Sequence, residues 1–238
     1  MLGPVNRFTS GLFGIGKKAI SNFRSFGYRK ATYNIPYNIN DDHFNSRLLD
    51  TEKLSALKRA IKPNNEVVVL SSGALIKRKG MDTVIEAFKA VGSPHAKLLI
   101  LGEGPDRGRL ESLKNGDPRI VFSGFLEKED VPYYFLSADI FILASHYDGW
   151  GLVINEAVMA DLAIISSLNV GASVDKLTHN ESALLYEPLD TDGFTAGLEL
   201  LISSKSERER LVENASHLKK ELSSAFNAKK VYDICCPH

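Results

Sequence analysis

The chain has 238 residues, 44% of them hydrophobic, a length that suits one large domain or two small ones. Its 29 Lys and Arg residues balance 29 Asp and Glu residues, so the sequence lacks the basic excess typical of nucleic-acid-binding proteins. The only cysteines, Cys235 and Cys236, are adjacent and have neither a zinc-binding nor a disulfide spacing. These cysteines favour a reducing, cytoplasmic setting. No stretch approaches the ~20 apolar residues of a membrane span, so we expect a soluble or peripheral protein.

The first 50 residues show little hydrophobic periodicity. Residues 15–26 can form an amphipathic helix that carries Lys17, Lys18 and Arg24 among apolar side chains. A solvated helix, or one that packs on other sequence, is favoured. A helix that lies on a membrane surface stays open, and with it peripheral contact with the inner face of a membrane.

From residue 51 onward, helical and strand patterns alternate regularly. The strands are continuous apolar runs, as burial on both faces of a sheet requires. This alternation predicts an α/β fold with a doubly wound parallel sheet, Rossmann-like in its organisation. Strands are expected at residues 66–70, 97–101, 119–122, 139–143, 162–166 and 183–186, and helices at 51–61, 81–91, 106–114, 130–137, 152–160, 193–202 and 206–222.

Each unusual loop of the sequence follows one of the first four strands. In open parallel sheets, ligands bind at the carboxyl ends of the strands, near the point where the strand order reverses. The sequence therefore predicts a ligand site on one rim of the sheet. The loops that would form it are residues 72–80, 102–105, 123–126 and 145–151.

The first of these loops is basic. Lys77, Arg78 and Lys79 precede Gly80, which permits a tight turn into the next helix. Three consecutive cations can balance the charge of a diphosphate, and an arginine can bind one bidentately. A solvated basic turn is an equally good interpretation of these residues taken alone.

The fourth loop is more specific, because Asp148, Gly149, Trp150 and Gly151 directly precede a helix. The unpaired N–H groups at the start of that helix form an anion-binding site. Glu156, further into the helix, can accept hydrogen bonds from two vicinal sugar hydroxyls. The alternative is that Asp148 is a turn residue and Glu156 an exposed helix residue.

Two other patterns are weaker. Gly102, Gly104 and Gly108 resemble a dinucleotide fingerprint but follow the second strand, so a nicotinamide-dependent oxidoreductase is a minor alternative. Asp190 and Asp192 match the D-x-D pattern of metal-dependent sugar transfer. They stand directly before a helix, so capping of that helix is the favoured interpretation, and no metal site is predicted.

The sequence resembles glycosyltransferase family 4 from about residue 15 to residue 222. Five motifs in the family's order carry the resemblance: SSGALIKRKGMDTVIEAF, LLILGEGPDRGRLESL, RIVFSGFLEKEDVPYYFLSADIFILAS, YDGWGLVINEAVMA and VGASVDKLTHNESALLYEPLD. The fourth resembles the family's E-x7-E motif. The resemblance implies the C-terminal, donor-binding half of a two-domain GT-B fold.

The resemblance also implies a role for each matching residue. Lys79 would hold the donor diphosphate with Arg78 beside it, Glu156 would bind the ribose, and Asp148 would replace the family's first glutamate at the transferred sugar. These make Asp148, Glu156 and Lys79 the candidate catalytic residues. Ala74 stands where the family usually has arginine. The full set of candidate donor-binding residues is Gly73, Arg78, Lys79, Gly102, Phe125, Leu126, Asp148, Gly149, Trp150, Gly151, Leu152, Val153 and Glu156.

From the resemblance we expect a remnant of an inter-domain region and linker at residues 1–50, a nucleotide-sugar-binding domain at 51–222 and a tail at 223–238. The implied reaction is retaining transfer of a hexosyl residue from a UDP- or GDP-type nucleotide sugar to a glycan or lipid-linked acceptor, as in polysaccharide biosynthesis. No cofactor is expected. The family's acceptor-binding half is not matched, so a separate acceptor-binding domain or subunit is an expected partner. A non-catalytic nucleotide-sugar-binding subunit is the main alternative.

Overall fold

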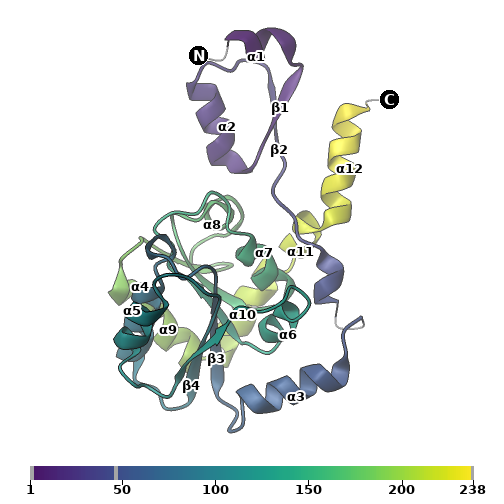
Figure 1. Cartoon of the computed structure of the whole chain (residues 1–238). Coiled ribbons are helices and arrows are strands. Elements are labelled where there is room, and N and C mark those ends of the chain that lie inside the picture. Colours follow the sequence, from purple (N-terminus) through teal and green to yellow (C-terminus); the bar gives the residue numbers. More distant parts are fainter. Residues whose placement is uncertain (1–2, 46–47, 237–238) are drawn as a thin grey trace.

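The computed structural model describes residues 3–45 and 48–236, and its centre is a six-stranded parallel sheet (Figure 1). The strand order β5-β4-β3-β6-β7-β8 reverses between β3 and β6, as in a doubly wound fold. The predicted α/β fold with a parallel, Rossmann-like sheet is confirmed. The strands are β3 (Val67–Ser72), β4 (Ala96–Leu101), β5 (Ile120–Gly124), β6 (Ile140–Leu143), β7 (Ala163–Ser167) and β8 (Leu184–Tyr186).

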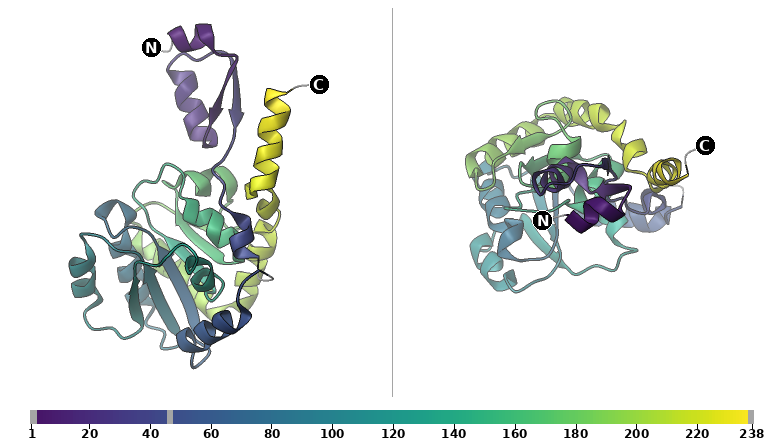
Figure 2. Two further views of the ribbon diagram at one scale, coloured as in Figure 1. Left: turned by 45° about the vertical axis from the view of Figure 1, so that its right-hand side comes forward. Right: turned by 90° about the horizontal axis from the view of Figure 1, so that it is seen from above.

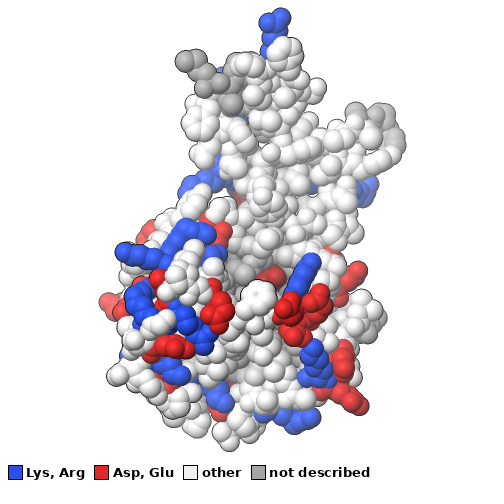
Figure 3. Space-filling model, viewed as in Figure 1, with Lys and Arg blue, Asp and Glu red and all other residues white. Residues whose placement is uncertain are grey.

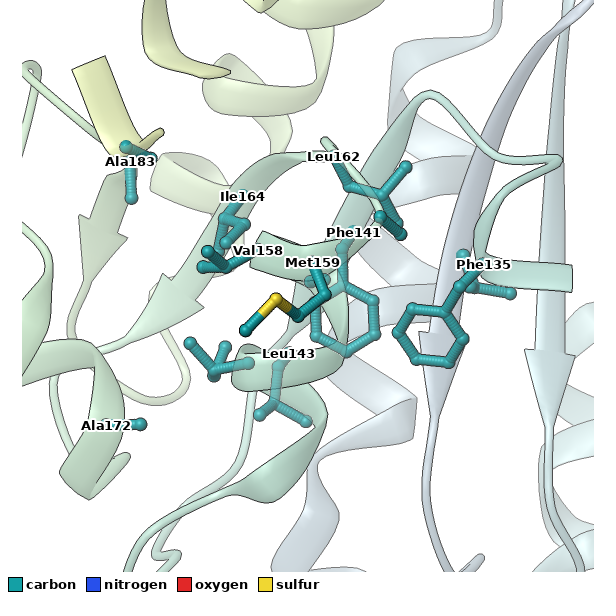
Figure 4. Close-up of a cluster of buried hydrophobic side chains, with 14 of the residues drawn as sticks. Phe135, Phe141, Leu143, Val158, Met159, Leu162, Ile164, Ala172 and Ala183 are labelled. Atoms are coloured by element: carbon teal, nitrogen blue, oxygen red, sulfur yellow. The ribbon is translucent and has the colours of Figure 1, made fainter. Parts of the chain in front are cut away.

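Helices cover both faces of the sheet, which explains why its strands are apolar throughout. In β6, Ile140 and Ile142 face one buried cluster, whereas Phe141 and Leu143 face the other. In the second of these clusters Phe135 stacks on Phe141, with ring centroids 5.5 Å apart (Figure 4). The helices of this domain are α3 (Thr51–Ile61), α4 (Met81–Val91), α5 (Arg107–Lys114), α6 (Val131–Phe135), α7 (Leu152–Met159), α8 (Gly171–Lys176), α9 (Thr191–Ser203), α10 (Lys205–Ala215) and α11 (Leu218–Leu222).

The N-terminal segment forms a small unit of its own. After α1 (Gly3–Phe8), strands β1 (Gly11–Gly14) and β2 (Ala31–Asn34) pair in parallel, and α2 (Gly16–Ser25) connects them. The sequence predicted the helix but not the strands, because four-residue strands carry too short a pattern. This unit lies beside α8, at the end of the molecule where α12 (Ser224–Cys235) also extends (Figures 1 and 2).

The helices differ from the expected elements in three places. The expected helix 206–222 is divided into α10 and α11 around Ser216 and His217. The expected tail contains α12, whose first turn is capped by the Ser223 hydroxyl. Helix α8, within the stretch expected as a closing loop, was not predicted. The preferred interpretation of Asp190 is confirmed, since its carboxylate accepts a hydrogen bond from the Gly193 N–H and caps α9.

Charges are mixed on the face shown in Figure 3. Lys and Arg side chains lie among Asp and Glu side chains over the sheet domain, and the N-terminal unit and α12 are mostly uncharged on that side. In the part of the chain that the structure describes, no helix is long and apolar enough to span a bilayer.

Gly102 is required where the loops after β3 and β4 meet. Its φ is +123°, and a Cβ there would overlap the carbonyl oxygen of Gly73. Its N–H also donates to the Gly124 carbonyl at 2.8 Å, so the backbone cannot move aside without loss of that bond. The glycine therefore allows three neighbouring strand ends to lie close together.

We predict that Gly102→Ala lowers the free energy of unfolding by about 2–4 kcal/mol, through backbone strain and overlap. Gly108→Ala is the matched control, because a Cβ at this position within α5 meets open space. The control should stabilise the chain by up to about 1 kcal/mol, because alanine favours helix. Urea unfolding of both variants measures the difference, and equal stability would contradict the argument.

Candidate functional site

An ion pair joins the two loops at the point where the strand order reverses. Lys79 ends the short helix η2 (Lys77–Lys79) after β3, and Asp148 lies in the loop after β6. The Lys79 Nζ donates to the Asp148 Oδ2 at 2.5 Å, and only 14% and 15% of these side chains is exposed. The predicted rim thus contains a largely buried pair of opposite charges.

A second set of contacts holds the same loops together. The His146 N–H donates to the Arg78 carbonyl at 2.9 Å, and the Arg78 Nη1 donates to the Tyr147 carbonyl at 2.6 Å. Gly80 follows in a left-handed turn, with φ +64°, where a Cβ would overlap the Ala144 carbonyl oxygen. The position of Lys79 is therefore fixed by backbone contacts on both sides of it.

The ion pair borders a cavity of about 650 Å³. Residues of α2, of the loop between β7 and α8, and of α8 itself also line this cavity. This volume is in the range of small-molecule binding sites. Its lining residues include Lys79, Asp148, Gly149, Trp150, Gly151, Leu152 and Val153 from the predicted site, together with Ile15, Lys18, Ala19, Asn22, Tyr37, Tyr147, Leu168, Asn169, Val170, Gly171 and Val174.

The start of α7 gives this cavity its anion-binding character. Gly151, at φ +85°, precedes the helix, and Leu152 and Val153 form its first turn. N–H groups in the first turn of a helix have no partner within the helix, and the helix dipole places partial positive charge there. The cavity thus combines these backbone donors with two lysines, Lys18 and Lys79, and one carboxylate, Asp148.

Trp150 lines the cavity and is itself almost fully buried. The ring is 4% exposed, and its Nε1 donates to the Asn155 Oδ1 at 3.2 Å. Asn155 in turn donates to the Tyr37 carbonyl at 2.7 Å, so α7 is tied to the segment after β2.

Glu156 lies on a different side of α7 and lines a second cavity of about 280 Å³. Leu152 lines both cavities, so the two lie next to each other along α7. Burial raises the pKa of Glu156 from its ordinary value of 4.5 to about 7. Among the described residues, none donates a hydrogen bond that offsets this effect. The side chains that line the second cavity are Asn38, Ile39, Asn40, His43, Phe44, Lys128, Val131, Pro132, Leu152 and Glu156.

Five predicted residues line neither cavity: Gly73, Arg78, Gly102, Phe125 and Leu126. The Arg78 guanidinium binds the Tyr147 carbonyl, Phe125 is 71% exposed, and Leu126 packs against the core. Gly102 and Gly104 bring loop backbones together, and Gly108 faces open space, so no observation favours a nicotinamide site. Across the described chain, no three His, Cys, Asp or Glu side chains form a group able to hold a metal.

Sequence reasoning missed the residues that reach the cavities from outside the sheet domain. Lys18, Ala19 and Asn22 come from α2, and Asn40 and His43 come from the segment after β2. The amphipathic pattern of residues 15–26 was the available signal. It could not show which part of the chain the helix would contact.

Comparison of the fold with solved structures places the chain in a known class. The C-terminal domain of a glycosyl transferase group 1 family protein, LpcC from Francisella tularensis, matches at a TM-score of 0.64 and 24% identity, over 76% of this chain and 95% of that domain. The Anabaena protein HepE, solved with UDP and glucose, matches at a TM-score of 0.81 and 17% identity, over 97% of this chain and 64% of HepE. The fold is that of the C-terminal domain of a GT-B glycosyltransferase.

Sequence comparison identifies the family. Residues 54–218 match the family described as glycosyl transferases group 1, and the chain belongs to that family. An uncharacterized glycosyltransferase of Methanocaldococcus jannaschii is 29% identical over 190 residues, which are 78% of this chain and 48% of that protein. The 2-deoxystreptamine N-acetyl-D-glucosaminyltransferase of Niallia circulans is 27% identical, over 80% of this chain and 54% of that protein. The chain thus spans about half the length of these relatives, and the predicted resemblance to family 4 is confirmed.

The raised pKa of Glu156 predicts a loss of stability as the pH rises. Its carboxyl group ionises near its ordinary pKa in the unfolded chain but near pH 7 in the folded chain, so folding favours the protonated form. Stability should therefore fall between about pH 4.5 and pH 7, and Glu156→Gln should raise the free energy of unfolding at pH 8 by up to about 3 kcal/mol.

Urea unfolding at pH 5 and pH 8 tests this expectation. Glu209→Gln is the control, because that side chain is 65% exposed. If the free energy of unfolding changes with pH in the same way for the unaltered chain and for Glu156→Gln between pH 5 and pH 8, the raised pKa of Glu156 is contradicted.

Proposed function

We propose that this chain is the nucleotide-sugar-binding half of a retaining glycosyltransferase that transfers a hexosyl residue. The observation that carries the proposal is the placement of the Lys79–Asp148 pair beside the start of α7, in a cavity that adjoins the Glu156 cavity. Phosphate binding needs a cation and backbone donors, whereas sugar binding needs carboxylates for hydroxyl groups. The two sets lie in neighbouring cavities that share Leu152.

In the proposed complex the diphosphate lies against the first turn of α7 and Lys79. The sugar lies near Asp148, and the ribose lies in the cavity of Glu156. When the bond between sugar and diphosphate breaks, negative charge develops on the leaving phosphate. Lysine and oriented N–H groups stabilise that charge without a metal ion, and their fixed positions reduce the reorganisation that the reaction requires.

The ion pair has a further consequence for this proposal. Asp148 holds the Lys79 ammonium at the cavity before any ligand binds, so the lysine does not lose its full conformational freedom on binding. A ligand phosphate then shares an ammonium group that is already in place.

The names of two relatives support a proposal for the acceptor. Their names include a lipopolysaccharide core biosynthesis glycosyltransferase of Rhizobium meliloti and a capsular polysaccharide biosynthesis glycosyltransferase of Staphylococcus aureus. A glycan or lipid-linked acceptor at the cytoplasmic face of a membrane agrees with these names. Because the chain spans about half of its relatives, we propose that a separate domain or subunit binds the acceptor.

We expect the chain to bind a UDP- or GDP-sugar, and Lys79→Ala to weaken binding about 10- to 100-fold, through loss of a charge-assisted contact. Isothermal titration calorimetry measures both. Lys77→Ala is the matched control, because this exposed lysine of the same turn lines neither cavity. Failure of the unaltered chain to bind any nucleotide sugar would overturn the proposed function.

Nucleotide-sugar binding should also depend on pH through Glu156. Ribose hydroxyls donate stronger hydrogen bonds to an ionised carboxylate than to a protonated carboxyl group. Binding of the ribose should therefore favour ionisation of Glu156, whose pKa is about 7. Affinity for UDP-glucose, whose phosphates do not titrate near neutrality, should therefore rise from about pH 5.5 to pH 8. In Glu156→Gln the affinity should be lower at pH 8 and independent of pH in this range. Dependence that persists in this variant would assign the effect to another group.

A further inference from the structure

Helix α2 contributes to the wall of the larger cavity, although it lies outside the residues that match the family. Lys18, Ala19 and Asn22 are the residues of α2 that line the cavity. A segment from the N-terminal unit therefore lines the same cavity as Lys79 and Asp148 of the sheet domain.

Contacts between α2 and α8 hold this wall in place. Asp175, in α8, accepts hydrogen bonds from the Lys17 N–H at 2.8 Å and from the Asn34 Nδ2 at 2.9 Å. The Lys17 Nζ also donates to the Asp175 carbonyl at 3.3 Å. We refer to these three residues, Lys17, Asn34 and Asp175, as the Asp175 clamp.

Gly16 completes the contact on the side of the clamp that faces Trp150. Its N–H donates to the Asn34 Oδ1 at 3.0 Å, so the same asparagine binds both Gly16 and Asp175. The backbone at Gly16 has a φ of +84°, and a Cβ there would lie 3.1 Å from the Trp150 ring. The start of α2 is thus fixed against the loop that carries Asp148.

The charges that line the cavity do not cancel. Its charged lining residues are Lys18, Lys79 and Asp148, and the last two neutralise each other at 2.5 Å. The Lys18 Nζ lies 5.7 Å from the centroid of the Tyr147 ring, and no carboxylate among the described residues pairs with it. Lys18 is therefore the uncompensated positive charge of the cavity.

We propose that Lys18 binds the diphosphate of the nucleotide sugar in this cavity, and that the Asp175 clamp positions it for this contact. The inference rests on the proposed function and adds a binding residue to it. A diphosphate ester carries about two negative charges at neutral pH, more than a lysine already paired with Asp148 can balance. Lys18 provides the second positive charge, and Tyr147 gives its ammonium a favourable resting position.

Calorimetry with UDP and UDP-glucose tests the role of Lys18. Lys18→Ala should weaken binding of both about 5- to 20-fold, as loss of a partly exposed charge-assisted contact predicts, and Lys18→Arg should restore most of it. Binding of uridine, which lacks phosphate, should not change. Lys30→Ala is the matched control, because its ammonium binds the Thr9 carbonyl and does not line the cavity.

The clamp is tested by Asp175→Ala and by the double variant. Asp175→Ala should weaken UDP binding in the same direction as Lys18→Ala, although no charge of the cavity lining is removed. In Lys18→Ala/Asp175→Ala the losses should not add, because the clamp acts through Lys18. Full additivity would show that Asp175 acts independently of Lys18, against the positioning role.

The outcomes separate the two levels of the proposal. If the unaltered chain binds UDP and Lys18→Ala binds it with the same affinity, the role of Lys18 is overturned and the proposed function still stands. A chain that binds neither UDP nor GDP, with or without sugar, overturns the proposed function and this inference with it. A loss in Lys18→Ala that extends equally to uridine would show a structural effect of the substitution, and would also count against the inference.

Discussion

The contact between Lys79 and Asp148 determines how the rim of the sheet is organised. Parallel strands leave a crevice where their order reverses, and the loops after β3 and β6 meet there, with Asp148 of the second loop held by a single parallel bridge to Val170. A largely buried ion pair must be well placed to offset the loss of hydration of both charges. Backbone contacts around Arg78 and His146 provide that placement. The cavity depends on this geometry, since one of its walls follows directly from Asp148.

The Glu156 carboxylate shows the opposite relation between burial and stability. It lies in a cavity, loses hydration and gains no hydrogen bond among the described residues, so its ionised form destabilises the folded chain. Binding sites often contain groups that a ligand, rather than the protein, satisfies. A carboxylate of this kind favours ligands with hydroxyl donors, because only such ligands remove the unfavourable effect of its burial.

The sequence was sufficient for the parts of the fold that have long, regular patterns. The alternation of apolar strands and helices predicted the parallel sheet and its rim, and the loop with Asp148 predicted a cavity-lining segment. It was insufficient where tertiary contacts decide. Whether Arg78 faces a ligand or a carbonyl depends on a single rotamer, and the exposure of Phe125 depends on the path of one loop. The position of α2 depends on Asp175, which lies 158 residues from Lys17.

The chain contains a single tryptophan, and its position gives the protein an internal optical reporter. The Trp150 indole is buried between Gly16 of the N-terminal unit and Asn155 of α7, and the residue lines the cavity. Any motion that separates the two parts of the chain must change the surroundings of this ring. Its emission therefore comes from one site, and its wavelength and intensity can follow opening and closing of the cavity in solution without an added dye.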